Sequence, residues 1–127
     1  MRTKLIALAA VLLAALAMCG WSLGYIGHCM DEAESLCVRA ILSMEDGDRD
    51  GAIEALNMLA EKWEKWSEPL EIVTDHMDLQ SVRESVISAR ICAEQADHED
   101  FRREAAQLEN AIRHIRDEED VRLSNVL

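Results

Sequence analysis

An uncharged apolar run near the N-terminus limits the folds open to this chain. Leu5 to Gly27 holds 23 residues without a single Asp, Glu, Lys or Arg. At about 1.5 Å rise per residue, such a run would be about 34 Å long as a helix, and the core of a bilayer is about 30 Å thick. The run therefore predicts one membrane-spanning helix over residues 5–27, within an N-terminal anchor over residues 1–29.

The charges on either side of the run predict which end lies in the cytoplasm. Arg2 and Lys4 precede it, and an acidic stretch that begins at Asp31 follows it. Basic residues next to a membrane helix favour the cytoplasmic side. Trp21 and Tyr25 lie near the other end, where aromatic rings favour the membrane–water interface. We therefore expect a single-pass protein of the cell membrane with a cytoplasmic N-terminus and an extracytoplasmic C-terminal domain.

Two other interpretations of the run stay open. A cleaved secretory signal has a shorter apolar core, and Ala7 to Ala17 would be such a core. The run continues without charge through Trp21 and Ile26, which favours an uncleaved anchor. A lipoprotein signal would end at Cys19, but the preceding residue is a methionine where a small residue is expected.

The outer part of the chain, residues 30–127, is strongly acidic. It holds all 25 acidic residues but only 11 of the 13 basic ones, and its formal net charge is therefore −14. This charge disfavours nucleic acid and anionic lipid as partners, and it is compatible with a cation or a basic partner. The commoner role of such a surface is to keep a domain soluble. The length suits one small domain with a modest core.

The outer domain is predicted to be all-α. It lacks the alternation of strands, and its apolar residues recur at spacings of three and four. The predicted helices run from the anchor to about Glu45, from about Gly51 to Met77, from about Asp78 to Ala96, from Asp97 onward, and over 117–127 as a short final helix that folds back. They would form an antiparallel helical bundle of two helical hairpins.

The second predicted helix contains the only proline. Its apolar stripe includes Trp63, Trp66 and Leu70 and keeps its phase past Pro69. We therefore expect a kinked but continuous helix, and a new helix capped by Ser67 is the alternative. Trp63 and Trp66 are interpreted as core or hairpin-packing residues, because such a stripe usually faces a core.

The turn after the first outer helix carries the sharpest local motif. Asp46, Asp48 and Asp50 match positions one, three and five of an EF-hand loop, and Gly51 matches position six. Position twelve, which carries a bidentate Glu in such loops, is Asn57. The motif is either a capped turn between helices or a calcium site. Calcium is the one cofactor that the sequence suggests.

The histidines and cysteines form no recognisable site in the sequence. A zinc site needs three or four ligands, and only His76 and His114 stand out. We expect His76 to form a hydrogen bond between helices and His114 to be a partly exposed neighbour of the apolar stripe. Cys37 and Cys92 are either a disulfide between helices or two buried free thiols. No nucleophile–base pair and no phosphate loop stand out, and we do not expect an enzyme.

Spaced single residues over roughly the last 75 positions carry a resemblance to a known family. They are Ala52, Leu59, Trp63, Asp75, His76, Asp78, Leu79, Val82, Ser85, Arg90, Leu108, His114, Ile115, Glu119, Leu123 and the ending Asn125, Val126 and Leu127. This pattern resembles an uncharacterised bacterial family, domain of unknown function 4363. The resemblance implies one N-terminal membrane segment and a helical outer part, and it implies no activity. The chain departs from the pattern at Gly51 and Pro69.

These features predict a non-catalytic protein that displays an acidic helical domain outside the cytoplasmic membrane and binds another envelope protein there. The alternative is a calcium-binding helical domain. The candidate metal ligands are Asp46, Asp48 and Asp50, and the candidate interaction or packing residues are Trp63, Trp66, His76 and His114.

Overall fold

Four long helices make up the part of the chain that the structure describes, residues 1–126. The structure is a computed structural model, and it describes the side chains of these residues except Leu23, Leu123 and Val126. The helices are α1 (Arg2–Glu45), α2 (Arg49–Leu70), α3 (His76–Glu94) and α4 (His98–Val126). No strand occurs among residues 1–126. The predicted all-α class is confirmed.

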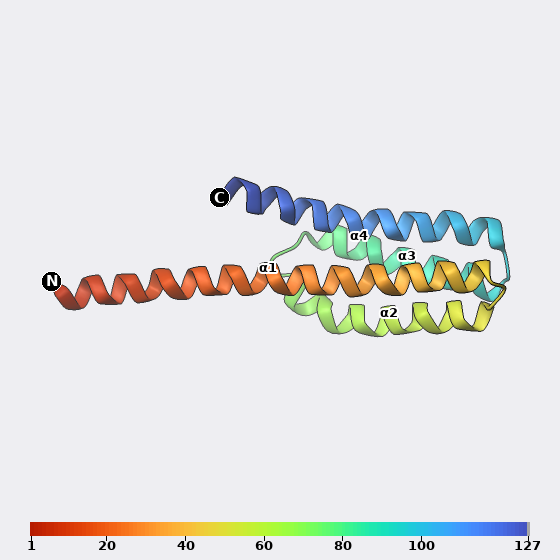
Figure 1. Cartoon of the computed structure of the whole chain (residues 1–127), viewed down its shortest axis with the longest axis horizontal. Helices are drawn as coiled ribbons and strands as arrows, with labels where there is room; N and C mark the ends of the chain where they lie inside the picture. Colours follow the sequence, from red (N-terminus) through yellow and green to blue (C-terminus); the bar gives the residue numbers. More distant parts are fainter. Residues whose placement is uncertain (127) are drawn as a thin grey trace.

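The helices pack as two antiparallel hairpins, α1 with α2 and α3 with α4 (Figure 1). Helix α2 also contacts α3, and α1 also contacts α4, which closes the four helices into a bundle. The predicted architecture of two helical hairpins is therefore confirmed. The N-terminal half of α1 extends beyond the bundle on the side where α4 ends (Figure 1).

Helix α1 is continuous, but its two halves differ in burial. Its N-terminal half is apolar, is not buried against the rest of the chain, and is long enough to cross a membrane. Burial begins at Ile26, which is 2% exposed, and continues with Cys29 and Met30. The bundle therefore begins inside the predicted anchor of residues 1–29, and the last residues of the apolar run belong to its core.

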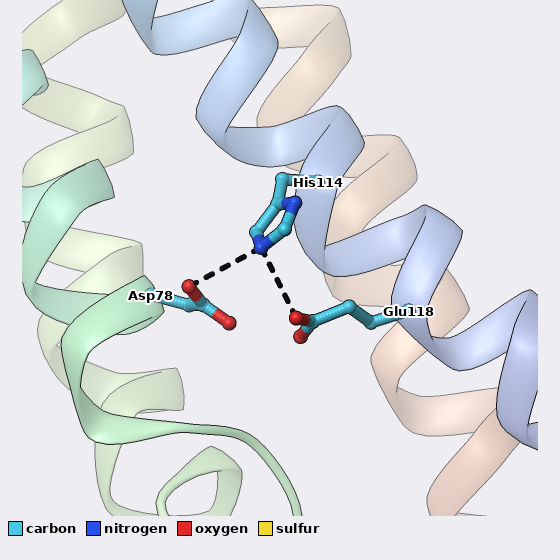
Figure 2. A group of neighbouring side chains, drawn as sticks. All are labelled: Asp78, His114 and Glu118. Atoms are coloured by element: carbon cyan, nitrogen blue, oxygen red, sulfur yellow. Dashed lines mark ion pairs between the residues drawn. The ribbon is translucent and has the colours of Figure 1, made fainter.

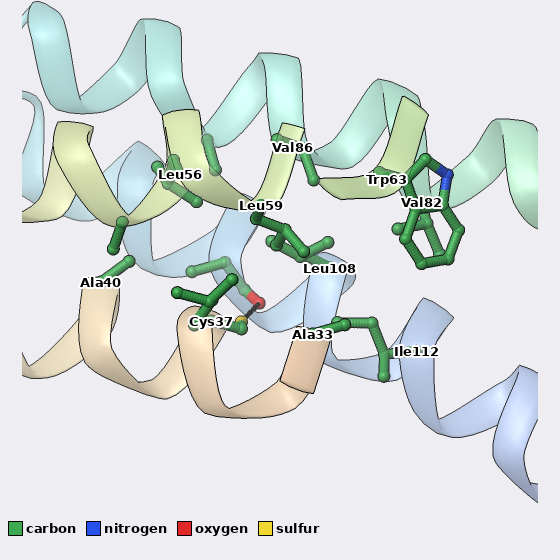
Figure 3. Close-up of a cluster of buried hydrophobic side chains, with 14 of the residues drawn as sticks. Ala33, Cys37, Ala40, Leu56, Leu59, Trp63, Val82, Val86, Leu108 and Ile112 are labelled. Atoms are coloured by element: carbon green, nitrogen blue, oxygen red, sulfur yellow. Dashed lines mark hydrogen bonds between the residues drawn. The ribbon is translucent and has the colours of Figure 1, made fainter. Parts of the chain in front are cut away.

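The core is built from the apolar stripes of all four helices (Figure 3). Small residues of α1, such as Ala33 and Ala40, allow the neighbouring helices to approach closely. Larger side chains of the other helices fill the space that remains: Leu56, Leu59, Trp63, Val82, Val86, Leu108 and Ile112. The Cys37 thiol donates a hydrogen bond to the Ala105 carbonyl oxygen, at 3.8 Å.

The turn between α1 and α2 spans only residues 46–48. Gly47 takes a φ of 80°, a left-handed conformation that glycine adopts without strain. Asp48 caps α2, and its Oδ1 accepts a hydrogen bond from the Gly51 backbone N–H at 2.9 Å. The turn is therefore capped, as one of the two interpretations of this motif expects, and Asp48 is the residue that caps the helix.

The prediction of a continuous helix through Pro69 is wrong. Helix α2 ends at Leu70, one residue after the proline, and α3 begins at His76. Pro69 has no N–H to donate, and the chain turns within two residues of it. The side chain of Asp75 then accepts a hydrogen bond from the Met77 N–H at 2.9 Å and so starts a new helix. Met77, the predicted last residue of the second helix, lies in α3 instead and is 77% exposed.

The alternative of a new helix capped by Ser67 is also wrong. Ser67 lies inside α2, and its hydroxyl donates a hydrogen bond to the Trp63 carbonyl oxygen at 2.6 Å. This bond, from a residue to the carbonyl four positions earlier, is typical of serine within a helix. The cap that the sequence analysis placed at Ser67 is instead provided by Asp75.

The predicted short final helix over residues 117–127 is not separate. Helix α4 begins after Asp97, whose Oδ1 accepts a hydrogen bond from the Asp100 N–H at 3.0 Å, and it continues to Val126. It contains neither glycine nor proline, and nothing in its sequence interrupts the helix. The Arg122 guanidinium donates to the Val73 carbonyl oxygen and so holds α4 against the turn between α2 and α3. Leu127 and the side chains of Leu123 and Val126, predicted to fold onto the bundle, lie outside the described part.

Candidate functional site

Three ligating side chains meet where the start of α3 lies beside the later part of α4 (Figure 2). Asp78 lies in the first turn of α3, and His114 and Glu118 are one turn apart on α4. The His114 Nε2 is 3.5 Å from Asp78 Oδ1 and 3.1 Å from Glu118 Oε1. One ligating atom of each residue lies within 4.8 Å of the other two. We call these three residues the histidine–carboxylate cluster.

Core packing on both helices sets the position of this cluster. The side chain of Leu79, next to Asp78, is buried, and so is that of Ile115, next to His114. Residues 114 and 118 are four apart, which places them on one face of α4. Asp75 is the N-cap of α3, three residues before Asp78. The carboxylate of Asp78 therefore lies in the first turn of α3, next to α4. The cluster therefore depends on the register in which α3 packs against α4.

Two carboxylates lie close together in the cluster. The pKa of Glu118 is raised, first by the Asp78 side chain, to which a protonated Glu118 would donate a hydrogen bond, then by burial and by the negative charge of Asp78. The Asp78 side chain is 19% exposed, and its Oδ2 is fully buried without a hydrogen-bond partner. The cluster thus contains two carboxylates and one imidazole. One imidazole cannot neutralise two negative charges, and it cannot donate a hydrogen bond to all four carboxylate oxygens.

A polar hollow of about 350 Å³ opens beside the cluster. Asp78 and His114 form part of its wall. The rest of the wall comes from Ser81, Ser85, Gln107, Asn110 and Ala111. The hydroxyl and amide groups there can hold water or a small polar molecule next to the histidine.

A model of one protein family covers nearly the whole bundle. The family is described as Domain of unknown function (DUF4363), and its model matches residues 20–126. The chain belongs to the DUF4363 family. The match confirms the resemblance found in the sequence, and it begins shortly before Ile26, where the bundle begins. Comparisons with curated proteins and with solved structures gave no match.

His76 does not join His114 in the DUF4363 bundle. It is the first residue of α3, and its exposed side chain lies with Nδ1 3.5 Å from Glu71 Oε1 in the preceding turn. Among the described residues, His76 therefore contacts the turn that precedes its own helix, and the hydrogen bond expected to another helix is not seen there. His114 is 60% exposed, next to the core residue Ile115, and pairs with the two carboxylates already described.

The two tryptophans contribute to packing in the DUF4363 bundle. Trp63 is buried, and its indole N–H donates a hydrogen bond to the Leu79 carbonyl oxygen at 3.2 Å. Trp66 is half-buried, and its ring meets that of Trp63 edge to face with 6.2 Å between centroids. Trp63 therefore links α2 to the first turn of α3, the helix that carries Asp78.

The EF-hand-like motif takes a different shape from an EF-hand loop. Such a loop surrounds its ion with a non-helical chain, whereas here α2 begins at Arg49 and includes Asp50. Asp46 and Asp50 are exposed, and the Asp48 carboxylate already caps α2. Asn57, the twelfth position, accepts a hydrogen bond from Arg90 at 3.2 Å. Calcium binding at this turn stays a prediction.

The cysteines are free thiols, and the disulfide considered between Cys37 and Cys92 is not formed. Cys37 is buried among the helices, and Cys92 is half-buried on α3. Burial raises the pKa of the Cys37 thiol to about 12, and the negative charges of Glu109 and Glu34 add to this effect. The thiol of Cys37 is therefore protonated at neutral pH and behaves as a small apolar side chain.

Sequence reasoning missed Asp78 and Glu118 as partners of His114. The spacing of His114 and Glu118, four residues apart on a predicted helix, was a usable signal. The third residue, Asp78, is 36 positions earlier in the chain. Only the register between α3 and α4 brings it into the cluster, and that register depends on where α3 begins after Pro69.

Proposed function

We propose that this DUF4363 protein is a non-catalytic, single-pass membrane protein that presents its bundle outside the cytoplasmic membrane and binds another envelope protein there. The observation that supports this proposal is the composition of α1. The same helix is apolar and exposed over its first half and forms bundle core over its second half. An apolar surface of this length is stable only when lipid or protein covers it.

The charges of the chain support the proposed orientation. Arg2 and Lys4 lie at the exposed start of α1, and all acidic residues lie from Asp31 onward. Basic flanks favour the cytoplasmic face, and the bundle would then be on the opposite side. Trp21 and Tyr25 stack with 5.4 Å between ring centroids, at the level where the free part of α1 meets the bundle.

The membrane-distal end of the bundle supports a role in binding a protein. Val38 and Leu42 are exposed on one face of α1. Beside them, a cavity of about 300 Å³ between α1 and α4 is lined by apolar residues that include Ile41, Met44 and Phe101. Glu45 and Glu109 also line this cavity, together with His98 and Arg102. An apolar hollow with a charged rim suits a protein segment that carries an apolar anchor residue, and the net charge of −14 over residues 30–127 favours a basic one.

A fusion of alkaline phosphatase to the C-terminus tests the location of the bundle, because this enzyme becomes active only outside the cytoplasm. We expect high activity from the full chain. A matched variant with Arg2→Glu and Lys4→Glu should lose part of that activity, because the charge difference across α1 becomes smaller. An inactive fusion of the unaltered chain at normal expression would contradict the proposed orientation.

The intact mass of protein extracted from membranes tests whether α1 stays whole. We expect the complete chain, released from membranes by detergent and not by alkaline carbonate. A mature chain that begins after residue 17, or one that carries a lipid on Cys19, would replace the anchor with one of the two alternatives.

A further inference from the structure

We propose that the histidine–carboxylate cluster binds a zinc ion that links α3 to α4. The ion would be held by Asp78 from α3 and by His114 and Glu118 from α4 (Figure 2). Nothing in the family description or in the motifs of the sequence assigns a metal to these residues. The site is independent of the membrane topology and goes beyond the proposed binding function.

The two distances from His114 to the carboxylates are close to those between the ligands of a zinc site. Zinc lies about 2.0–2.2 Å from imidazole nitrogen and carboxylate oxygen, and tetrahedral ligands are then about 3.3 Å from one another. The His114 nitrogen is 3.5 Å from the Asp78 oxygen and 3.1 Å from the Glu118 oxygen. Small side-chain rotations would therefore suffice to bind the ion.

The unpaired oxygen of Asp78 is an independent sign of a missing partner. Oδ2 is fully buried and has no hydrogen bond. A buried polar atom without a partner costs about 1–3 kcal/mol, and such atoms are rare in folded proteins. A cation between Asp78 and Glu118 would satisfy this oxygen and would also remove the repulsion between the two carboxylates.

The ligand types favour zinc over calcium. Calcium takes six to eight oxygen ligands, and the cluster offers one nitrogen and two carboxylates. One imidazole with two carboxylates suits zinc, and three protein ligands leave a fourth position for water. Helix α4 leaves His114 60% exposed beside the polar hollow, where that water would fit. Without metal, His114 would only form ion pairs or hydrogen bonds with the two carboxylates, and the experiment must distinguish the two arrangements.

A zinc titration of the full chain in detergent micelles tests the proposal. Calorimetry should show one zinc per chain, and cobalt(II) in its place should give the visible absorption of tetrahedral coordination. His114→Ala and Glu118→Gln should each weaken zinc binding by more than about tenfold, because even outer partners of a metal site are worth about 10–100-fold. Zinc should also raise the melting temperature of the unaltered chain and not that of His114→Ala.

Matched controls exclude other histidines. His98→Ala removes an exposed histidine at the other end of α4, and His76→Ala removes the one nearest to Asp78 in the chain. Both should keep zinc binding unchanged. If His114→Ala fails to fold, Asp78→Asn is used in its place, because asparagine keeps the shape of the aspartate side chain.

Three results would overturn the proposal. The first is the absence of saturable binding at one zinc per chain. The second is binding that survives in the cluster variants or disappears in the controls. The third is a stronger response to calcium than to zinc, which would direct attention to the acidic surface instead.

Discussion

Cys37 shows how the bundle changes the chemistry of a single residue. Its thiol has a pKa of about 12 in the folded chain, against a usual value of 9.0, chiefly because of burial. The folded chain therefore holds this proton more tightly than the unfolded chain does. The resulting stability is complete below pH 9 and is lost as the pH rises from 9 towards 12, because the unfolded chain ionises first.

This difference predicts a specific loss of stability in base. The free energy of unfolding should fall more steeply between about pH 8 and pH 10.5 in the unaltered chain than in Cys37→Ala. Urea unfolding of the full chain in micelles at both pH values measures the two slopes. The alanine variant also loses the packing of the buried thiol, a cost that does not change with pH, and the comparison therefore concerns the slopes only. Equal slopes would show that Cys37 does not hold its proton more tightly after folding.

Helix α2 depends on a contact between Asp48 and Gly51 at its first turn. The Gly51 N–H donates to the Asp48 carboxylate, and a Cβ added at Gly51 would lie 2.3 Å from Asp48 Oδ2. Alanine at this position would therefore displace the capping side chain. Loss of such a cap costs about 0.5–2 kcal/mol, whereas alanine in place of glycine gains about 1 kcal/mol within a helix.

The two substitutions should therefore depend on each other. In the unaltered chain, Gly51→Ala should change the free energy of unfolding little or lower it. In the Asp48→Ala background, where no cap remains to be lost, Gly51→Ala should stabilise by about 1 kcal/mol. A double-mutant cycle followed by thermal or urea unfolding measures this coupling. The same change in the free energy of unfolding in both backgrounds would show that the Asp48 cap does not determine the effect of a side chain at residue 51.

The helices were predictable because their apolar stripes are long. The apolar residues that recur at spacings of three and four from Ala33 to Met44 and from Phe101 to Ile115 lie in the core. The error at Pro69 arose because the phase of the stripe continued past a residue that cannot donate a backbone hydrogen bond. Val73 still packs against the core from the turn, so the apolar pattern continued although the helix ended.

The candidate site was less accessible to sequence reasoning. Its residues come from two helices, and their meeting depends on a register that no local pattern contains. The prediction that α3 begins near Asp78 differed from the observed start by two residues, which is a normal uncertainty for a helix end. The buried stripe of α3, from Leu79 to Ala93, determines which way Asp78 faces on its own helix. It does not determine which turn of α4 lies beside Asp78.

At the scale of the whole molecule, ion pairs hold the bundle together near the proposed membrane surface. Arg116 of α4 contacts Asp31 and Glu34 of α1, and Lys62 of α2 contacts Glu32. These contacts join α1 to both of its neighbours just beyond the apolar run. We therefore expect the proposed partner to bind at the other end, around the exposed Val38 and Leu42.

A photo-reactive amino acid placed at Leu42 tests this surface in cells. We expect a discrete cross-linked product that becomes weaker at high salt, because an acidic domain and a basic partner attract each other through screened charges. Glu54, exposed near the same end of the bundle on α2, is the matched control and should give no such product. Identical products from both positions, or diffuse products only, would contradict a defined interface around Leu42.

Because α1 is one continuous helix, the number of residues in its free part determines the height and the rotation of the bundle. About 20 residues separate Ile26 from the end of α1, so the distal turn stands about 30 Å above the point where the helix leaves the apolar run. Height and direction cannot change separately, because one residue more in the free part of α1 would lift the bundle by about 1.5 Å and rotate it by about 100°. A neighbour in the envelope would then meet a different face at a different height.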